Sequence, residues 1–576
     1  MGWPYQFVAL DAPGKQARRH SIDRHALYAH LSALLPVALF LLYRFVVWLV
    51  WKTLSSDRGA YSAVPDSPRL KKQRQSVFGS CVTLVRRVAW WLGDDILFMG
   101  QNWGQRAQLI AGIGWTFWLL FLCTVGTGND YLHLTKRLGL VAISQFPAQY
   151  LLALKNLNPF ALAFQSSHEQ VNRWHRVLGR IVYLLLFLHT CLYLNYYIQE
   201  GILGQKVVSL VPALGISAFT GMCLLGATSF GIVREYSYRV FFITHLIVAL
   251  SLPLIIYFHA HHSTFYVGGA LVLFLADLIK RKIDTITATT TIEAIPGTNL
   301  IKIVADVPAE KSARFRERPG SHVYINIPYA SRPSPNPVSL ANIVFEFAFN
   351  PFTVAAVDDD SGALTLIARC HNGPMTRNLA RLSNANSAGL KVPLSIEGPY
   401  GSTTHFMNRA RIDFNRVLLV AGGVGATFIM PLYRAMLSES SAVKVQMIWA
   451  VRTPGDATWP VNGNKNGIMD GDNIQIYLTG NILDARNNDT TASIRGEQIE
   501  MNDISEDRRN RYDRIYDNKR PNFQNIVDEL FRQSVEDRIA VVVCGPAGMA
   551  QELRSCVGVW VKKGRRVWWH NESFAW

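Results

Sequence analysis

Four histidines lie at a repeated spacing inside two long apolar segments. His175 and His189 are 14 residues apart in one segment, and His245 and His259 are 14 residues apart in the other. Fourteen residues rise about 21 Å along an α-helix and complete nearly four turns, so both members of a pair face nearly the same way. Neutral imidazole is a common haem ligand, so two such helices side by side would hold two b-type haems, one stacked above the other.

The alternative interpretation is that the four histidines only form hydrogen bonds inside a helical bundle. Ionisable residues within membrane spans are rare and usually functional, and this favours haem ligation.

The histidines require membrane-spanning helices to position them, each of about 20 mostly apolar residues. The sequence predicts seven spans, of which the fourth and the sixth carry the histidines. The third candidate is the weakest, because it is short and contains Pro147. The spans are Ala26–Trp51, Ala107–Val125, Leu138–Leu154, Trp174–Tyr196, Val207–Thr228, Arg239–His259 and Phe265–Ile279.

Basic residues set the expected orientation. Residues 280–282, which follow the last span, are all basic, and the positive-inside rule places them in the cytosol. His175 and His245 then belong to the inner haem, and the other two histidines belong to the outer haem. Seven spans place the N-terminus outside, although the basic residues between 15 and 24 argue against this orientation of the first span.

The composition agrees with a chain that lies partly in lipid. Of its 576 residues, 49% are hydrophobic and 17% are charged, against about 25% charged in an average soluble protein. The net charge of +17 would suggest nucleic-acid binding in a soluble protein, but here we attribute it to cytosolic Lys and Arg. The seven cysteines show no Cys-x-x-Cys spacing, which disfavours a zinc site or a dense disulfide framework. We expect no cleavable signal peptide, because the first apolar stretch is long enough to span.

The sequence changes character after Ile283. Short β-rich runs, such as Leu300–Val307 and His322–Ile327, predict a small antiparallel barrel. From Arg416 onward strands and helices alternate, which predicts an α/β nucleotide-binding domain. A polar stretch near 456–520 predicts a disordered insertion in that domain.

The transmembrane motifs resemble those of a known family. Arg137–Leu140, Glu169–Val171 and Asn172, together with His175–Arg180, are similar to the fungal-type ferric (metallo)reductases of the ferric reductase and NADPH oxidase superfamily. The resemblance continues to the C-terminus and covers about four-fifths of the chain. It implies a ferredoxin-reductase-like FAD barrel and an NADPH-binding domain after the spans.

The flavin site is implied by three motifs. Asn350-Pro351-Phe352-Thr353 resembles the family's His-Pro-Phe-Thr flavin motif, with asparagine in place of the usual histidine. Asparagine can form hydrogen bonds but cannot carry a proton, so the departure bears on flavin affinity or tuning. The Gly-x-x-Thr loop at Gly373 is expected to hold the FAD pyrophosphate, because glycine admits a phosphate to the backbone. The third motif, Pro319–Pro328, resembles the strand and turn that open the flavin barrel of this family. Further expected flavin-site residues are His322 in that motif, Arg369, Thr376 and Gly398.

The nicotinamide site is implied by a strand, a Gly-rich turn and a helix over residues 417–436. This arrangement offers backbone N–H groups to a dinucleotide phosphate. The resemblance further implies that Arg452 meets the 2′-phosphate of NADPH, that Cys544 lies beside the nicotinamide, and that Phe574 covers the flavin ring. The alternative for Arg452 is that it is an ordinary surface arginine that meets no cofactor. The alternative for Trp576, the C-terminal aromatic residue, is that it only forms part of an aromatic patch. The complete set of nicotinamide residues adds Gly422, Gly423, Gly425, Thr427, Gly545 and Pro546.

We therefore expect four regions: a first span and basic cytosolic loop (1–104), a haem-binding transmembrane domain (105–282), an FAD barrel (283–410) and an NADPH domain (411–576). The expected activity is an NADPH-dependent ferric-chelate reductase that moves electrons through FAD and two b-type haems to an external acceptor, because flavin can link hydride donors to one-electron acceptors. An NADPH oxidase that reduces dioxygen to superoxide is the alternative, and a proton channel using the histidines would leave the nucleotide motifs unexplained. We expect a multi-pass plasma-membrane protein whose partners are lipid and the acceptor, with no nucleic acid and a possible iron-uptake partner.

Overall fold

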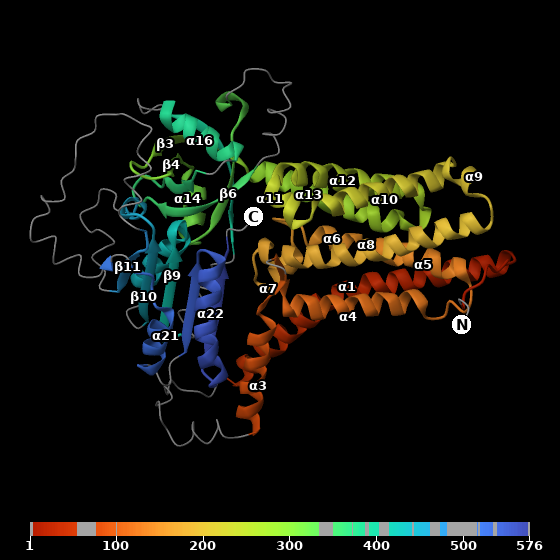
Figure 1. Ribbon diagram of the computed structural model, residues 1–576, viewed down its shortest axis with the longest axis horizontal. Coiled ribbons are helices and arrows are strands. Elements are labelled where there is room, and N and C mark those ends of the chain that lie inside the picture. The colour runs from red at the N-terminus through yellow and green to blue at the C-terminus, as the bar shows by residue number, and fades with distance from the viewer. Residues whose placement is uncertain are drawn as a thin grey trace, which may run out of the picture. The chain divides into compact units, whose positions relative to one another are not determined.

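A computed structural model describes most of the chain as two units (Figure 1). The described residues are 4–54, 77–98, 101–332, 349–370, 373–385, 391–401, 414–439, 443–460, 473–480, 515–516, 519–533 and 538–573. The first unit comprises residues 1–62 and 91–283, and the second comprises residues 63–90 and 284–576. Each unit has hydrophobic cores of its own.

The first unit is a helical bundle. Its long helices are α1 (Ala12–Leu54), α4 (Arg106–Thr124), α8 (His168–Gln199), α10 (Leu210–Thr228), α12 (Tyr238–His259) and α13 (Thr264–Asp284). Shorter helices connect them, namely α5 (Tyr131–Ser144), α6 (Phe146–Leu151), α7 (Pro159–Phe164), α9 (Leu203–Val207) and α11 (Gly231–Tyr236). A hairpin of β1 (Asp95–Phe98) and β2 (Gln101–Gln105) precedes α4, and α3 (Val77–Leu92) carries the boundary between the units.

Six helices among the described residues are long and apolar enough to cross a membrane. They correspond to six of the seven predicted spans. The prediction of a seventh continuous span over Leu138–Leu154 is wrong, because this segment is divided between α5 and α6. The division falls at Gln145, which is the C-cap of α5 and the N-cap of α6. Pro147 thus lies in the first turn of α6, where the N–H that proline lacks would have no partner within the helix.

The two short helices nevertheless carry the chain back along α8. The Tyr131 hydroxyl, at the start of α5, donates a hydrogen bond to the carbonyl of Leu192 (2.9 Å). At the other end, the Gln149 carbonyl in α6 lies 2.9 Å from Nδ1 of His175. The 17 residues of α8 between His175 and Leu192 rise about 26 Å, so α5 and α6 together run antiparallel to α8 over most of a hydrocarbon thickness.

The second unit contains the predicted closed barrel. Its strand order is β3-β4-β7-β6-β5-β8, with antiparallel pairing throughout. Alternate residues of these strands fill a core of aliphatic side chains. The strands are β3 (Ile286–Ala294), β4 (Leu300–Asp306), β5 (His322–Asn326), β6 (Asn350–Val357), β7 (Leu364–Arg369) and β8 (Val392–Tyr400), with α14 (Ala309–Arg316) and α16 (Pro374–Ala385) beside them.

The remainder of this unit is a parallel six-stranded sheet of order β12-β11-β10-β9-β13-β14. The strands are β9 (Arg416–Gly422), β10 (Lys444–Val451), β11 (Ile474–Leu478), β12 (Ile515–Tyr516), β13 (Ile539–Cys544) and β14 (Val567–Glu572), and the helices are α18 (Ala426–Glu439), α21 (Phe523–Arg532) and α22 (Ala547–Lys562). The stretch near 456–520 that was predicted as an insertion supplies β11 and β12 to the sheet, and residues 461–472, 481–514 and 517–518 lie outside the described part.

The path of α5 and α6 leads to a topology prediction. We expect Asn129→Cys, in the loop before α5, and Asn156→Cys, in the loop after α6, to lie on opposite sides of the membrane. Both residues are exposed. An impermeant maleimide should label Asn129→Cys on intact cells, and Asn156→Cys only after permeabilisation, with the unsubstituted chain giving the background. Labelling of both variants on intact cells would show that the two helices re-enter on one side.

Candidate functional site

The predicted inner histidine pair is brought together by α8 and α12. The ring centroids of His175 and His245 are 6.0 Å apart, and the ring planes are inclined at 59°. An iron–nitrogen bond of about 2 Å on each side, plus about 1.1 Å from each nitrogen to its ring centre, gives about 6.2 Å between the centroids of two axial imidazoles. The observed separation therefore fits two ligands on one metal.

The predicted outer pair, His189 and His259, lies where glycines on neighbouring helices admit the rings. A Cβ atom on Gly139 would lie 2.7 Å from the His189 ring, and one on Gly215 would lie 2.5 Å from the His259 ring. The two histidines are also close enough to interact electrostatically. Any larger residue at either glycine would displace a histidine ring, so the backbone of α5 and of α10 defines where the rings sit.

Three of the four rings are fixed by a backbone carbonyl at Nδ1. His175 pairs with Gln149 O at 2.9 Å, His189 with Thr135 O at 2.7 Å, and His259 with Val211 O at 2.8 Å. A ring that donates from Nδ1 presents its Nε2 lone pair to a metal, which is the usual arrangement of ligating histidines. The Nδ1 atom of His245 is buried and has no hydrogen-bond partner among the described residues.

Sequence reasoning used Arg234 only as a mark of the cytosolic side and did not assign it to the site, although it lies close to this pair. Its guanidinium lies over the Phe241 ring, with its carbon 5.2 Å from the ring centroid, and the Phe241 ring is 5.2 Å from that of His245. The Arg234 Nε is buried without a hydrogen-bond partner in the described part of the chain. Arg176 in α8 lies close enough to Arg234 to interact with it electrostatically, and Arg173 and Arg180 lie near Arg176. The sequence shows arginines near the ends of the two histidine-bearing segments, but it does not show which of them approaches the histidines.

The predicted flavin motifs meet on two paired strands of the barrel. In the register of β5 with β6, His322 lies opposite Thr353, Val323 opposite Phe352, and Ile325 opposite Asn350. A Cβ atom on Gly398, in β8, would lie 3.2 Å from the His322 carbonyl, so glycine permits the close approach of β8 to β5. The tetrapeptide that resembles the flavin motif thus pairs with β5, which lies in the Pro319–Pro328 segment.

Arg369, at the end of β7, extends from the barrel to the Gly-rich turn after β9. One of its terminal nitrogens would lie 3.2 Å from a Cβ atom placed on Gly423, whose φ is +54°. The Arg369 Nε is buried and unpartnered among the described residues. A half-buried guanidinium whose Nε is an unsatisfied donor, next to a half-buried backbone turn, fits an anionic ligand such as a pyrophosphate.

The Gly-x-x-Thr loop lies at the N-terminus of α16. Gly373 precedes the first helical residue, and the Arg377 N–H donates to the Gly373 carbonyl at 3.1 Å. The Thr376 side chain bonds only weakly to the same carbonyl, at 3.4 Å. Free N–H groups at a helix N-terminus are suited to phosphate, which agrees with the predicted role of this loop.

Glycines allow two strand ends of the parallel sheet to meet. A Cβ atom on Gly425 would lie 2.0 Å from the Cys544 carbonyl, and one on Gly545 would lie 3.0 Å from the Gly422 backbone. A Cβ atom on Gly422 would lie 2.7 Å from Pro546. The turns after β9 and β13 are therefore packed backbone to backbone at the carboxyl edge of the sheet, where α/β domains bind nucleotides.

The Gly-rich turn is held from beneath by Trp449, which sequence reasoning did not single out. Trp449 is fully buried, and its indole N–H donates to the Gly423 carbonyl at 3.1 Å. Thr427 is also buried and donates to the Val424 carbonyl at 2.9 Å, so its hydroxyl stabilises the same turn. The direct contact with a cofactor predicted for Thr427 remains a prediction.

The remaining predicted nucleotide residues have different environments. Arg452 directly follows β10 and is exposed, while its carbonyl accepts a bond from the Gly480 N–H at 3.2 Å. Burial, together with nearby Glu572, raises the pKa of the Cys544 thiol well above its usual value, so the sulfur stays neutral at physiological pH. Phe574 and Trp576 lie outside the described residues.

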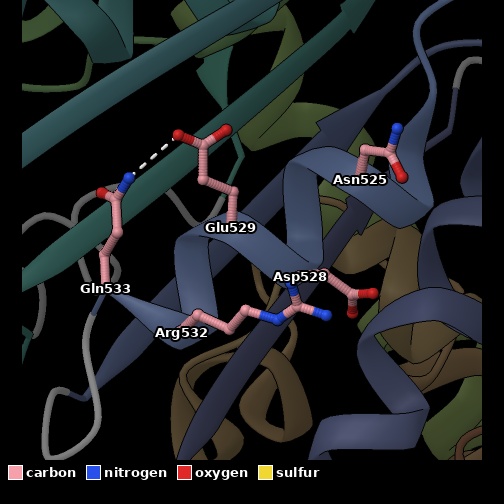
Figure 2. A pocket seen from close by; sticks show the side chains of 5 residues that line it. All are labelled: Asn525, Asp528, Glu529, Arg532 and Gln533. Atoms are coloured by element: carbon pink, nitrogen blue, oxygen red, sulfur yellow. Dashed lines mark hydrogen bonds between the residues drawn. The ribbon is translucent and has the colours of Figure 1, made fainter.

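A shallow hollow on α21 is unsuited to the predicted chemistry (Figure 2). Its lining residues are all polar, and Gln533 donates to Glu529 across one helical turn at 2.9 Å. Asp528 accepts a hydrogen bond from the Trp560 indole at 2.8 Å, and hydrogen bonds from Gln524 and Trp560 lower the pKa of its carboxyl. These interactions stabilise the packing of α21 on α22, and none of the predicted site residues lines the hollow.

Comparison with known proteins agrees with the three parts of the site. Residues 138–256 match the ferric reductase like transmembrane component, residues 287–404 an FAD-binding domain, and residues 414–558 the ferric reductase NAD binding domain. The chain is 23% identical over 467 residues to a probable metalloreductase AIM14 of Scheffersomyces stipitis, with 77% of this chain and 82% of the relative covered.

Two further relatives carry ferric reductase names. Ferric/cupric reductase transmembrane component 2 of Schizosaccharomyces pombe is 22% identical, covering 76% of this chain and 80% of the relative. Ferric reductase transmembrane component 6 of Saccharomyces cerevisiae is 25% identical, covering 74% of this chain and 57% of the relative. The chain belongs to the ferric reductase family and is a transmembrane oxidoreductase that depends on FAD and NAD(P)H.

The support of the Gly-rich turn by Trp449 can be tested by Trp449→Phe. Loss of one hydrogen bond to a buried carbonyl costs about 1 kcal/mol, so we expect KM for the nicotinamide nucleotide to rise about fivefold. Trp459→Phe is the matched control, because Trp459 is a buried neighbour whose ring is 6.1 Å from that of Trp449. An equal rise of KM in both variants would mean that the effect comes from packing alone.

Proposed function

We propose that this protein transfers electrons from cytosolic NADPH, through FAD and two b-type haems, to ferric chelates on the opposite side of the membrane. The observation that carries the proposal is the pair of facing rings of His175 and His245, 6.0 Å apart, with a second pair 14 residues further along the same two helices. FAD, when bound, accepts a hydride and releases single electrons, which is the conversion that lies between NADPH and haem iron.

The environment of the histidines supports haem as the ligand. Carbonyls at Nδ1 orient His175, His189 and His259 for coordination through Nε2. Gly139 and Gly215 leave room for the rings of the outer pair. Near the inner pair, Arg234 and the arginines of α8 offer charge for the haem carboxylates, and the unpartnered Arg234 Nε is a donor that an anionic group would satisfy.

The nucleotide residues support NADPH as the donor. Arg452 ends a strand at the carboxyl edge of the sheet and is exposed, so its guanidinium is accessible to a 2′-phosphate. The packed turns at Gly422 and Gly545 leave backbone N–H groups for the diphosphate. Cys544 is neutral and buried, so its role beside the nicotinamide is one of packing and not of nucleophilic attack.

The choice of a ferric chelate over dioxygen rests on the relatives. These relatives are named as a ferric reductase, a ferric/cupric reductase and a probable metalloreductase. The exposed His262, three residues beyond His259, lies 3.2 Å from a carboxylate oxygen of Asp23, and both side chains are about half exposed. An imidazole and a carboxylate side by side at this end of the bundle offer a contact for a metal chelate.

We place the protein in the plasma membrane with the FAD and NADPH domains in the cytosol. The basic residues at 280–282 and the arginines near Arg234 mark the cytosolic ends of the spans under the positive-inside rule. An outward flow of electrons from cytosolic NADPH then meets an extracellular acceptor, and the reduced metal would require an uptake partner.

Whole-cell reduction of an impermeant ferric chelate tests the acceptor. We expect cells that express the protein to reduce the chelate at the same rate with and without superoxide dismutase, because direct transfer to the chelate does not pass through superoxide. Suppression of most of the rate by the dismutase would instead establish dioxygen as the acceptor. An expressed His175→Ala chain gives the background, since it lacks a ligand of the inner pair.

The ligand assignment is tested by His245→Ala in the purified protein. We expect the haem content to fall by about half and NADPH-driven haem reduction to stop, because one of the two pairs loses a ligand. Reduction of FAD by NADPH should be unchanged, since the nucleotide site lies in the other unit. The exposed His20→Ala serves as the matched control. Normal haem content and reduction in the His245 variant would refute the assignment.

A further inference from the structure

Helix α3 (Val77–Leu92) lies between two spans in sequence but is too short to be a span itself. One of its faces is occupied by contacts within the second unit. The Arg554 guanidinium lies 4.2 Å from the centroid of the Trp90 ring and donates to the Trp90 carbonyl at 2.8 Å. A Cβ atom on Gly558 would lie 3.0 Å from the Trp90 indole nitrogen, so α22 fits closely against this face.

The opposite face of α3 is apolar and exposed. Its residues recur every three or four positions, so they form one continuous stripe along the helix. The exposed fractions are 60% for Leu84, 66% for Val85, 46% for Val88 and 49% for Trp91, and Cys81 is exposed on the same stripe. A continuous apolar stripe of this kind marks an interaction surface, whereas single exposed apolar residues are ordinary.

The C-terminal end of α3 is attached to the first residue of a membrane span. Arg106, which begins α4, donates to the Trp91 carbonyl at 3.2 Å and to the Asp94 carboxylate at 2.9 Å. Its guanidinium also lies 4.9 Å from the Trp91 ring centroid. The hairpin of β1 and β2 connects α3 to α4 and brings the end of α3 next to the beginning of α4. We therefore expect α3 to end at the level where α4 enters the membrane. Tryptophan is enriched at this level.

The charge around the stripe suits an anionic surface. Arg86 and Arg87 follow one another on α3. The sequence just before the helix contains four more basic residues, Arg69, Lys71, Lys72 and Arg74. Helices with an apolar face and flanking basic residues lie in the interface plane of membranes, and anionic lipids attract their basic residues.

We infer that α3 is an interfacial helix whose stripe (Cys81, Leu84, Val85, Val88 and Trp91) lies in the headgroup region of an anionic phospholipid leaflet. The occupant of the stripe is the membrane in which the protein is embedded. The inference depends on the membrane spans and not on the identity of the electron acceptor, so it stands or falls independently of the proposed function.

The test places a nitroxide at Val88→Cys, on the stripe, or at Arg87→Cys, beside it, in the full chain in nanodiscs with one-third phosphatidylserine. Both variants also carry Cys81→Ser and Cys191→Ser, which remove the exposed native thiols. We expect the ratio of oxygen to water-soluble nickel collisions to be at least about threefold higher at position 88 than at position 87, because oxygen concentrates in lipid and the nickel chelate in water.

Two results would overturn the inference. Equal collision ratios at the two positions would place the stripe in water. Low access of position 88 to both reagents would show that protein covers it, including a second copy of this chain. An unchanged ratio at position 88 in wholly zwitterionic discs would overturn the preference for anionic lipid. FAD fluorescence of each variant reports whether the second unit has folded, so that only folded variants are compared.

Discussion

The structure depends on how the histidine rings of the bundle are held. An imidazole can coordinate a metal only in one tautomer and one orientation, and a hydrogen bond from its other nitrogen selects both. Here the acceptors are backbone carbonyls, at Thr135, Gln149 and Val211, and not carboxylates. Backbone carbonyls introduce no charge into an apolar environment, where a carboxylate would be costly.

This constraint accounts for the broken path of α5 and α6. Carbonyls inside a regular helix are already used by the helix, so a carbonyl that also accepts from a ring must lie where a neighbouring helix approaches closely. Gly139 permits that approach for α5. The interruption at Gln145, whose amide donates to the Ala29 carbonyl at 2.9 Å, lets α6 change direction and present Gln149 to His175. The break that removes a continuous span thus supplies the contact for the inner ring.

Sequence reasoning predicted the features that follow from regular periodicity. The 14-residue spacing of histidines predicted which rings face one another, because helix geometry alone relates the positions within each span. The bounds of β4 and β5 followed from short β-rich runs, and the predicted bounds agree with the structure to within one residue. Strands β11 and β12 were missed because they are short and lie within a polar stretch that was predicted to be a disordered insertion.

Other residues could not be predicted because their roles depend on contacts between distant segments. Trp449 supports the Gly423 carbonyl from the next strand, and its sequence context is that of an ordinary buried strand residue. Arg234 lies over Phe241 because a short helix, α11, precedes α12. The proline before Ala148 lowered the expectation of a span but did not show where the chain would turn. Tertiary approach, and not local propensity, decided each of these.

The four histidine rings differ in hydrogen bonding and in nearby charge, and this difference would give the two proposed haem sites different electronic properties. His245 is the ring whose buried Nδ1 has no partner among the described residues, and it lies one aromatic ring away from the positive charge of Arg234. A histidine that does not donate from Nδ1 is a weaker electron donor through Nε2, and a nearby positive charge favours the more reduced state of a bound metal. Both effects act at the inner pair. At the outer pair both rings are anchored to carbonyls, so hydrogen bonding and charge would distinguish the two proposed haem sites although histidine is the ligand at all four positions.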